Sequence, residues 1–156
     1  MTIYHVYHKI NKYLAIKLEA NNQGLTKLEL VPEPSSEYQG SPKTNIHIDN
    51  SIAQIDNFFN RKATSFSLKL DLKGTIFQNE VWQELVKIPY GQTKTYKEIA
   101  ENLGKDKAYR AIGNACNKNP FHIIIPCHRI LGSNNSLTGF KAGLEVKKYL
   151  LEFEQG

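Results

Sequence analysis

The sequence feature that most constrains the fold is a change in the spacing of apolar residues at Gly74. Residues 66–73 read F-S-L-K-L-D-L-K, so apolar and polar side chains alternate as they do in a half-buried β-strand. From Thr75 onward, apolar residues recur instead at the intervals of an α-helix. We therefore predict an α+β protein with an N-terminal α/β domain at residues 1–73 and a mostly helical C-terminal domain at residues 74–156.

The N-terminal domain is predicted to be an antiparallel sheet covered by one helix. Residues with high strand propensity are concentrated in three segments, 2–10, 13–18 and 25–31. Asn21-Asn22-Gln23-Gly24 is a typical turn between the last two segments. Residues 32–45 have no periodicity and predict a surface loop. Helical spacing follows at about residues 49–61, with Asp49 or Asn50 as the expected N-cap.

Two longer helices are predicted in the C-terminal domain. Thr75 can cap a helix that ends before Pro89. Residues 144–153 form another amphipathic helix. The apolar residues expected to pack inward are Phe77, Val81, Trp82 and Leu85 in the first helix, and Val146, Tyr149, Leu150 and Phe153 in the second.

Between these helices, the sequence predicts two short helices joined by a tight turn. Thr95 and Glu98 have the spacing of a capping box for a helix that ends at Gly104. Asp106 is the expected cap of the next helix, at about residues 107–118. Two short helices joined in this way form a helix-turn-helix, whose second helix enters a DNA groove.

The distribution of charge agrees with a DNA-binding helix pair. The net charge is +5 and the isoelectric point is near 9.1, which permits a polyanionic partner. Basic residues cluster on or beside the two helices, at Lys97, Lys105, Lys107, Arg110 and Lys118. Small residues such as Ala111 and Gly113 would let a helix approach DNA closely. The alternative is a solvated basic face on a helix pair that binds no DNA.

The segment at residues 121–131, F-H-I-I-I-P-C-H-R-I-L, predicts a short strand followed by a reactive cysteine. Three isoleucines favour a strand, and Pro126 ends it. Cys127 follows beside His128 and Arg129, and neighbouring basic groups favour the nucleophilic thiolate by lowering a thiol pKa. The alternative is a small buried side chain without chemistry. Residues 130–138 then predict a hairpin or wing.

Composition limits the other kinds of site. Cys116 and Cys127 are the only cysteines, and no Cys/His spacing typical of metal ligands is present, so we expect neither a disulfide nor a metal. His5, His8 and His47 are expected to be ordinary surface or edge residues. No signal-peptide pattern and no apolar run of bilayer length occur. We expect a cytoplasmic protein with no membrane partner.

The C-terminal half resembles the O6-alkylguanine-DNA alkyltransferase family, also called methylated-DNA-protein-cysteine methyltransferases. The resemblance is carried by I-P-C-H-R-I at residues 125–130, by Y-R-A-I-G-N-A and N-P before it, and by T-G-F-K-A-G-L-x-V-K-x-x-L-L-x-x-E after it. It spans about residues 74–154. It implies a ribonuclease H-like N-terminal domain and a winged helix-turn-helix domain that carries the active-site cysteine.

The resemblance also implies the roles of the site residues. Cys127 is the alkyl acceptor, His128 is the base that keeps it as thiolate through a bound water, and Glu154 orients His128. Asn119 braces the turn between the recognition helix and the active-site strand. The residues implied in binding the substrate base are Tyr96, Pro126, Phe140 and Lys141, and those implied in binding DNA are Lys97, Lys105, Arg110 and Ser133.

The implied function is repair of double-stranded DNA that carries O6-alkylguanine. The alkyl group moves from O6 of guanine, or from O4 of thymine, to Cys127 after the nucleotide is flipped out of the duplex and Arg110 fills the gap. The thioether product is inert, so a monomer would act once and use no cofactor. Two other functions stay open on the residues alone, a DNA-binding sensor without transfer chemistry and a Cys-His hydrolase, which would need an oxyanion hole.

Three positions depart from the commonest pattern of the family. Phe140 stands where many members have tyrosine, so it can stack on a base but cannot donate a hydroxyl hydrogen bond. Lys141 and Ala142 replace smaller residues in the pocket loop, which affects how bulky O6 groups such as benzyl would fit. The zinc ligands of some relatives have no counterpart, and Cys116 is expected to be a packing residue.

Overall fold

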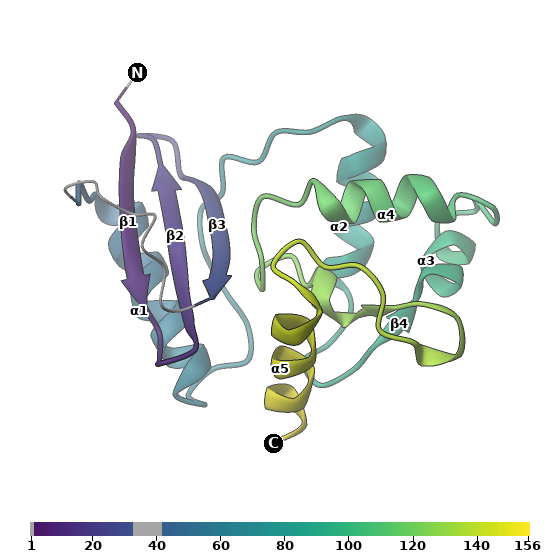
Figure 1. Cartoon of the computed structure of the whole chain (residues 1–156). Coiled ribbons are helices and arrows are strands. Elements are labelled where there is room, and N and C mark those ends of the chain that lie inside the picture. The colour runs from purple at the N-terminus through teal and green to yellow at the C-terminus, as the bar shows by residue number, and fades with distance from the viewer. Residues whose placement is uncertain (1, 33–41) are drawn as a thin grey trace. The chain divides into compact units, whose positions relative to one another are not determined.

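The computed structural model describes residues 2–32 and 42–156. Two compact units are formed, Met1–Lys73 and Gly74–Gly156. The first unit contains a sheet and a helix and the second is mostly helical, which confirms the α+β fold class (Figure 1). Most of the loop predicted at residues 32–45 lies outside the described residues.

The first unit is built on a three-stranded antiparallel sheet in the order β1, β2, β3. The strands are β1 (Tyr4–Lys9), β2 (Leu14–Ala20) and β3 (Leu25–Pro32), close to the predicted segments. The register places Leu18 across from Leu28, so two buried apolar side chains pack as a cross-strand pair. Asn21 closes the predicted turn, because its Oδ1 accepts hydrogen bonds from the N–H groups of Gln23 and Gly24 at 2.7 and 3.1 Å.

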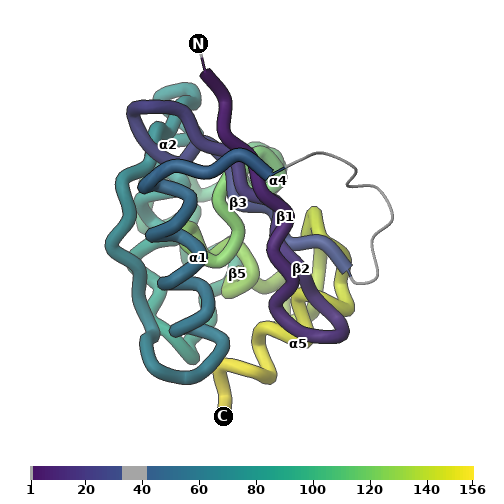
Figure 2. The backbone as a smooth tube through the Cα atoms, turned by 90° about the vertical axis from the view of Figure 1, so that its left-hand side faces the viewer, coloured from purple at the N-terminus to yellow at the C-terminus, as the bar shows by residue number. Residues whose placement is uncertain are grey.

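Helix α1 (Ile46–Phe59) lies along one face of this sheet, as Figures 1 and 2 show. Its buried residues are Ile48, Ser51, Ile55 and Phe58. The helix begins earlier than predicted, because its N-cap is Asn45 and neither Asp49 nor Asn50. The Asn45 side chain accepts a hydrogen bond from the Ile48 N–H at 3.0 Å, so the first turn is already closed where the predicted caps stand.

Residues 66–73 do not form the predicted strand. Leu70 makes an isolated parallel bridge with Leu25 at the start of β3. Earlier in the segment, the N–H and carbonyl groups of Ser67 both bond to the side chain of Gln54 on α1, at 2.8 Å each. Backbone pairing with β3 is therefore limited to the hydrogen bonds of Leu25 with Lys69 and Asp71, and at Ser67 a side chain takes the place of a neighbouring strand.

The second unit, all of whose residues are described, packs helices around a buried apolar core. Its α-helices are α2 (Ile76–Val86), α3 (Tyr96–Asn102), α4 (Tyr109–Asn117) and α5 (Leu144–Gln155). Thr75 caps α2 as predicted and forms a complete capping box with Gln78, while Thr95 caps α3. The indole N–H of Trp82 donates to the Ala115 carbonyl at 2.9 Å, which ties α2 to α4.

Helices α3 and α4 form the predicted helix-turn-helix, but α4 begins later than expected. Its N-cap is Ala108, without a side-chain hydrogen bond, so Asp106 is not the cap. The Ala108 N–H bonds to the Lys105 carbonyl at 3.0 Å. Residues 105–108 therefore form a turn that encloses Asp106, and the helix starts only after this turn closes.

No strand forms at residues 121–126, contrary to the prediction. The chain turns tightly there, and the Ile125 N–H bonds to the Phe121 carbonyl at 3.0 Å. Ile123 has a φ of 71°, which β-branched residues rarely adopt. Asn119 holds this turn, because its Oδ1 accepts from the Phe121 N–H at 2.9 Å and its Nδ2 donates to the Ile125 carbonyl at 2.8 Å. These local hydrogen bonds outweigh the strand propensity of the isoleucines.

The 3₁₀ helix η1 (Cys127–Arg129) follows this turn and leads into β5 (Ile130–Leu131). Strand β5 pairs in parallel with β4 (Lys94–Thr95), so residues 130–138 do not form the predicted hairpin. Instead, the Gly132 N–H bonds to the Ser136 carbonyl at 2.8 Å around the 3₁₀ helix η2 (Ser133–Asn135). Glycine suits this loop, since a Cβ at Gly132 would lie 2.7 Å from the Ser136 Oγ.

Candidate active site

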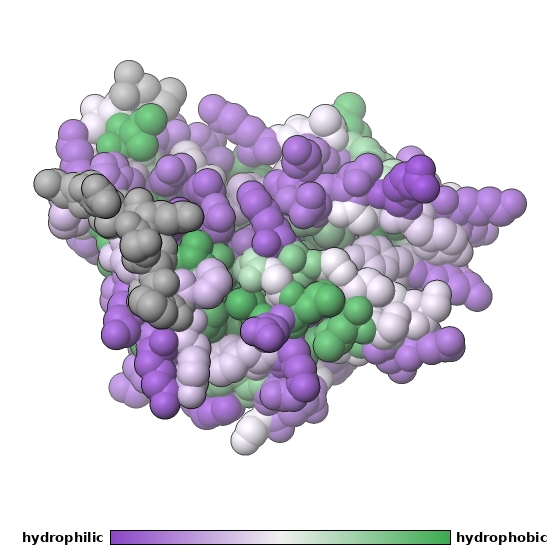
Figure 3. Space-filling view, in the orientation of Figure 1, coloured by the Kyte–Doolittle hydropathy of each residue, from purple (hydrophilic) through white to green (hydrophobic). Residues whose placement is uncertain are grey.

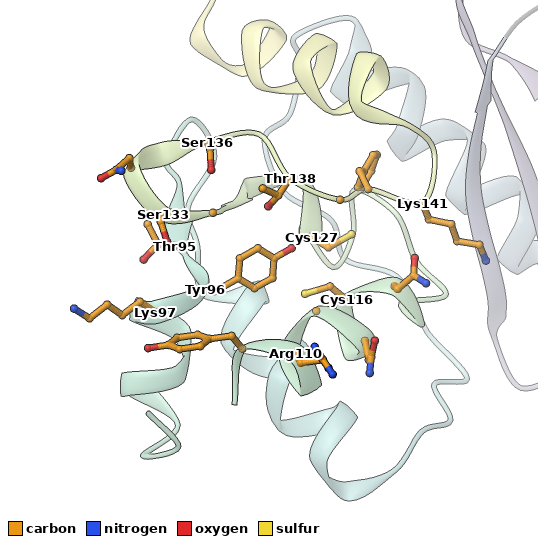
Figure 4. A pocket seen from close by; sticks show the side chains of 18 residues that line it. Thr95, Tyr96, Lys97, Arg110, Cys116, Cys127, Ser133, Ser136, Thr138 and Lys141 are labelled. Atoms are coloured by element: carbon orange, nitrogen blue, oxygen red, sulfur yellow. The ribbon is translucent and has the colours of Figure 1, made fainter. Parts of the chain in front are cut away.

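A cavity of about 1250 Å³ is lined by α3, α4 and the loop at residues 132–141. The predicted site residues among its lining are Tyr96, Lys97, Arg110, Cys127, Ser133, Phe140 and Lys141. In Figure 4, Tyr96, Cys116 and Cys127 point toward the same space from three different segments. The fold therefore brings a thiol, a phenol and basic side chains to one cavity.

Cys127 is buried at the start of η1 and still reaches the cavity, with 4% of its surface exposed. Its Sγ accepts a hydrogen bond from the Asn119 Nδ2 at 3.2 Å. The same Nδ2 bonds to the carbonyl of Ile125 in the preceding turn. Asn119 therefore fixes both the turn before the cysteine and the thiol itself.

The electrostatic surroundings of Cys127 differ from those that the sequence predicts. Burial raises the pKa of the thiol to about 11, while the Asn119 hydrogen bond and the charge of Lys147 lower it by less. Arg129 does not hold a thiolate, because its guanidinium bonds to Glu154. Successive side chains of a 3₁₀ helix point in directions about 120° apart, so adjacency in sequence does not give contact here.

Glu154 on α5 is the centre of a buried polar network. Its Oε2 lies 2.6 Å from the His128 Nε2. The Arg129 Nε and Nη2 donate to its two oxygens at 2.8 and 2.9 Å, and the Arg129 Nη1 donates to the Ile88 carbonyl at 2.8 Å. Burial raises the pKa of Glu154, but the hydrogen bonds from His128 and Arg129 outweigh burial and lower this pKa to about 2. The carboxylate is therefore ionised at neutral pH.

His128 is fully buried beside Glu154. Burial lowers the pKa of its imidazole, against the hydrogen bond and charge of Glu154. The neutral ring donates from Nε2 to the Glu154 carboxylate, which leaves Nδ1 as the acceptor nitrogen. This Nδ1 is buried and has no hydrogen-bond partner among residues 2–32 and 42–156.

The residues predicted to bind the substrate base occupy different places. Tyr96 lines the cavity, its hydroxyl is hydrogen-bonded to Thr138, and burial raises its pKa, so it remains a protonated phenol. Phe140 also lines the cavity, with its ring centre 5.4 Å from that of His122. Lys141 lines the cavity from an exposed position. Pro126 is buried and is not part of the lining.

The residues predicted to bind DNA are mostly exposed at the cavity. Lys97, Arg110 and Ser133 line it from exposed positions. Lys105 does not line the cavity, and its Nζ lies 5.6 Å from the ring centre of Phe77. Figure 3 shows strongly hydrophilic side chains over much of the molecular face in view.

Two residues near the cavity, Thr138 and Lys147, stand in the motif that carries the resemblance, but the sequence predicted no role for either. Thr138 bonds to the Tyr96 hydroxyl, and Lys147 acts electrostatically on Cys127. A signal for Lys147 was present, because it lies three and seven residues before Leu150 and Glu154 and therefore on the same buried face of α5. The signal for Thr138 was its place as the first residue of the T-G-F-K-A-G-L motif.

Two other kinds of site are not formed by the described residues. Within residues 2–32 and 42–156, no group of three or more His, Cys, Asp or Glu side chains could hold a metal ion. None of the helices in the described part of the chain has the length and apolar character needed to span a bilayer.

Known proteins share both the sequence and the fold. Residues 76–156 match the family described as 6-O-methylguanine DNA methyltransferase, DNA binding domain. The methylated-DNA-protein-cysteine methyltransferase of Methanosarcina barkeri is 43% identical over 149 residues, which cover 90% of each chain. The crystal structure of Mycobacterium tuberculosis O6-methylguanine methyltransferase is 34% identical with a TM-score of 0.83, over 99% of this chain and 93% of that one. The crystal structure of Mycobacterium tuberculosis OGT in complex with DNA is 35% identical with a TM-score of 0.81, over 98% and 92% of the two chains.

Proposed function

The chain belongs to the methylated-DNA-protein-cysteine methyltransferase family of DNA repair enzymes, and we propose that Cys127 is the residue that accepts the alkyl group. The observation that supports this most directly is the 3.2 Å contact of the Cys127 thiol with Asn119 at the cavity. The pair formed by His128 and Glu154 supports it further, because a nucleophile, a base and an orienting carboxylate then occur together.

The proposed reaction is a single in-line displacement on the alkyl carbon. The Nδ1 of His128 takes the thiol proton through a bound water, and the sulfur of Cys127 attacks the carbon attached to O6 of guanine. A carbon–sulfur bond forms while the bond from carbon to O6 breaks, and guanine leaves as an anion. The protonated hydroxyl of Tyr96 donates the hydrogen bond or proton that this anion needs. The thioether is inert, so each molecule reacts once and needs no dissociable cofactor.

The target base must leave the duplex to reach a thiol this deeply buried. We expect α4 to enter a groove of double-stranded DNA, with the guanidinium of Arg110 filling the gap in the base stack. The exposed positions of Lys97, Arg110 and Ser133 along the cavity support this role. Lys105 lies in the turn before α4 and contributes positive charge to the same surface.

The proposed substrates include O4-alkylthymine, because its alkyl group is bonded to an exocyclic oxygen in the same way. Tyr96 and Phe140 provide a phenol and a flat apolar ring for either base, and Lys141, which also lines the cavity, affects how bulky adducts would fit. One copy of the chain supplies every proposed site residue, so we expect a monomer. A thiol acceptor must stay reduced, which favours a compartment such as the cytoplasm.

Intact-mass spectrometry after incubation with O6-methylguanine duplex tests the proposed function. We expect each protein molecule to gain the mass of one methyl group, and the unmodified duplex to give no change. Cys127→Ser should abolish the gain while duplex binding stays nearly unchanged, because the thiolate is needed for attack and not for groove contact. The matched variant Cys116→Ser should retain the gain.

The other outcomes have definite meanings. Transfer that survives Cys127→Ser but is lost in Cys116→Ser would make Cys116 the acceptor. Tight binding to the modified duplex without any mass gain would make the protein a sensor of damage. Turnover of an ester substrate without a methylated product would favour a Cys-His hydrolase.

A further inference from the structure

Tyr109 is an aromatic residue at the cavity that the proposed reaction has not yet used. Three aromatic residues of the described chain line the cavity, Tyr96, Tyr109 and Phe140. Tyr96 is hydrogen-bonded to Thr138, and Phe140 lies beside His122 with ring centres 5.4 Å apart. Tyr109 is 44% exposed, and its side chain forms no hydrogen bond and no ring contact within residues 2–32 and 42–156. Unlike the other two rings, that of Tyr109 is therefore free to contact a ligand.

The surroundings of Tyr109 favour a nucleic acid as this ligand. Tyr109 is the first residue of α4, and Arg110 follows it directly. Lys105 and Lys107, in the turn before α4, are exposed, as is Arg110. Proteins hold single strands of nucleic acid with exposed cations that attract the phosphates and with aromatic rings on which the bases stack. The start of α4 provides both kinds of group at one place.

Tyr109 and Arg110 cannot fill the same gap in DNA. Successive side chains of an α-helix point about 100° apart around its axis, so the ring and the guanidinium extend from α4 in different directions. Both nevertheless line the cavity in which the thiol of Cys127 is buried. With Arg110 in the place of the extruded nucleotide, the exposed ring of Tyr109 is available to the nucleotides next to it on the same strand.

We propose that Tyr109 stacks on a base that flanks the target nucleotide on the lesion strand. The ring holds this flanking base at the cavity while the target base enters. Stacking on an aromatic ring tolerates any sequence, because every base has a flat π-face. The proposal rests on the proposed function, but it concerns the binding of DNA and can be tested without methyl transfer.

This role differs from those proposed for the other residues of the cavity. Arg110 compensates for the broken stack of a duplex, so its contribution should be small in single-stranded DNA. Tyr96 and Phe140 serve the target base itself, so their contributions should persist for a free O6-alkylguanine base. A residue that binds the flanking base should matter for duplex and for single strand, and it should not matter for the free base, which has no neighbour.

Equilibrium binding to single-stranded DNA tests the role of Tyr109. Cys127→Ser removes the proposed acceptor, so in this variant the affinity for an oligonucleotide with one O6-methylguanine can be measured by fluorescence anisotropy. Adding Tyr109→Ala should weaken binding about tenfold, which is the usual order of the contribution of one stacked base. Tyr109→Phe keeps the ring and should bind as before. Tyr109→Leu, which is apolar but not flat, should bind as weakly as Tyr109→Ala.

Removal of the flanking base from the DNA identifies the stacking partner. Two further oligonucleotides carry an abasic residue directly on one side or on the other side of the lesion. One of them should bind about tenfold more weakly to the protein that retains Tyr109. With that oligonucleotide, Tyr109→Ala should cause no further loss, because ring and base contribute as a pair. Tyr13→Ala is the matched control and should change no affinity, since Tyr13 is also exposed but belongs to the first unit and does not line the cavity.

Other results would overturn the proposal. If Tyr109→Ala lost the same factor with and without each flanking base, or if neither abasic residue weakened binding, the ring would contact no neighbouring base. Original affinity in Tyr109→Leu would exclude stacking. A lower free energy of unfolding in urea, or slower methyl transfer from the free base, would make Tyr109 a structural residue of α4. Each of these results is compatible with methyl transfer to Cys127. Conversely, the expected flanking-base effect in a protein that transfers no methyl group would leave the proposal standing and refute the proposed function.

Discussion

At the scale of single residues, Glu154 organises the largest number of polar groups in the site. It accepts hydrogen bonds from His128 and Arg129 and also from the Gly91 N–H, at 3.1 Å. Its lowered pKa, about 2, lies below that of a free carboxyl, so this group contributes stability above pH 4.5 that is lost as the pH falls toward 2. At every pH at which a thiol ionises, Glu154 is therefore charged.

Replacement of this carboxylate should change the pH dependence of the reaction. In Glu154→Gln, His128 loses the negative charge that raises its pKa, so the imidazole becomes a weaker base for the thiol proton. The apparent pKa of Cys127 then rises, and methyl transfer at neutral pH should slow about tenfold for each unit of rise. Single-turnover rates measured across a pH series should show the profile displaced to higher pH.

Stability must be measured on the same protein, because Glu154→Gln leaves the buried Arg129 without its anion. Glu152→Gln, an exposed change on the same helix, is the matched control and should alter neither rate nor stability. A folded Glu154→Gln variant with an unchanged pH profile would restrict Glu154 to a structural role.

At the scale of elements, the sequence predicted the helices and strands that are specified by short-range patterns such as alternation, turns and capping residues. The strands β1 to β3 follow from alternation and the Asn21 turn, and α2 and α3 follow from the caps at Thr75 and Thr95. The strand predicted at residues 66–73 was wrong: the segment makes only an isolated bridge at Leu70, and the backbone of Ser67 bonds to a distant side chain, Gln54. Local propensity carries no information about such a partner.

The same limit applies to the site. Cys127, His128 and Glu154 were found through a motif. The ion pair in which Glu154 neutralises the charge of Arg129 depends instead on how α5 packs against η1. Lys147 is buried where it donates to the carbonyls of Thr138 and Gly139, which are distant from η1 in sequence. Sequence adjacency predicted that Arg129 would act on the thiol, whereas the structure pairs its guanidinium with Glu154.

The turn at residues 119–127 provides a prediction at this scale. Asn119→Ala removes three hydrogen bonds, to Phe121, Ile125 and Cys127, and leaves buried backbone groups without partners. Each unsatisfied buried group costs about 1–3 kcal/mol. We expect the free energy of unfolding to fall by at least this amount, as measured by urea denaturation, and methyl transfer to slow.

Asn102→Ala, at the exposed end of α3, serves as the control for Asn119→Ala and should leave both quantities unchanged. If Asn119→Ala retained the original stability, Ile123 would hold its positive φ without the Asn119 bridge. Side-chain packing, and not the Asn119 hydrogen bonds, would then determine the conformation of the turn.

At the scale of the whole molecule, every proposed site residue belongs to the second unit, Gly74–Gly156. The proposed reaction with DNA requires the target base to leave the stack, because the thiol of Cys127 is only 4% exposed. The proposed extrusion of the target nucleotide therefore takes place in the complex of protein and DNA. Substitution of Arg110 tests this step.

Arg110→Ala should slow repair of an intact duplex about tenfold or more, because filling of the stack offsets an unstacking cost of a few kcal/mol. The defect should be smaller when the lesion lies in mismatched or single-stranded DNA, where unstacking costs less. It should vanish for a free O6-alkylguanine base, which needs no flipping. The rate of methyl transfer is measured by intact mass for each of the four substrates, which are intact duplex, mismatched duplex, single strand and free base.

Arg110→Lys is the informative companion variant, since it keeps the charge but lacks the flat guanidinium that can stack between bases. We expect it to recover phosphate attraction, seen as duplex affinity, and to recover little of the repair rate. Recovery of both would make charge, and not stacking, the contribution of Arg110. If Arg110→Ala lost the same factor on duplex, single strand and free base, the defect would lie in the cavity around Cys127, because only that part of the reaction is common to all three substrates.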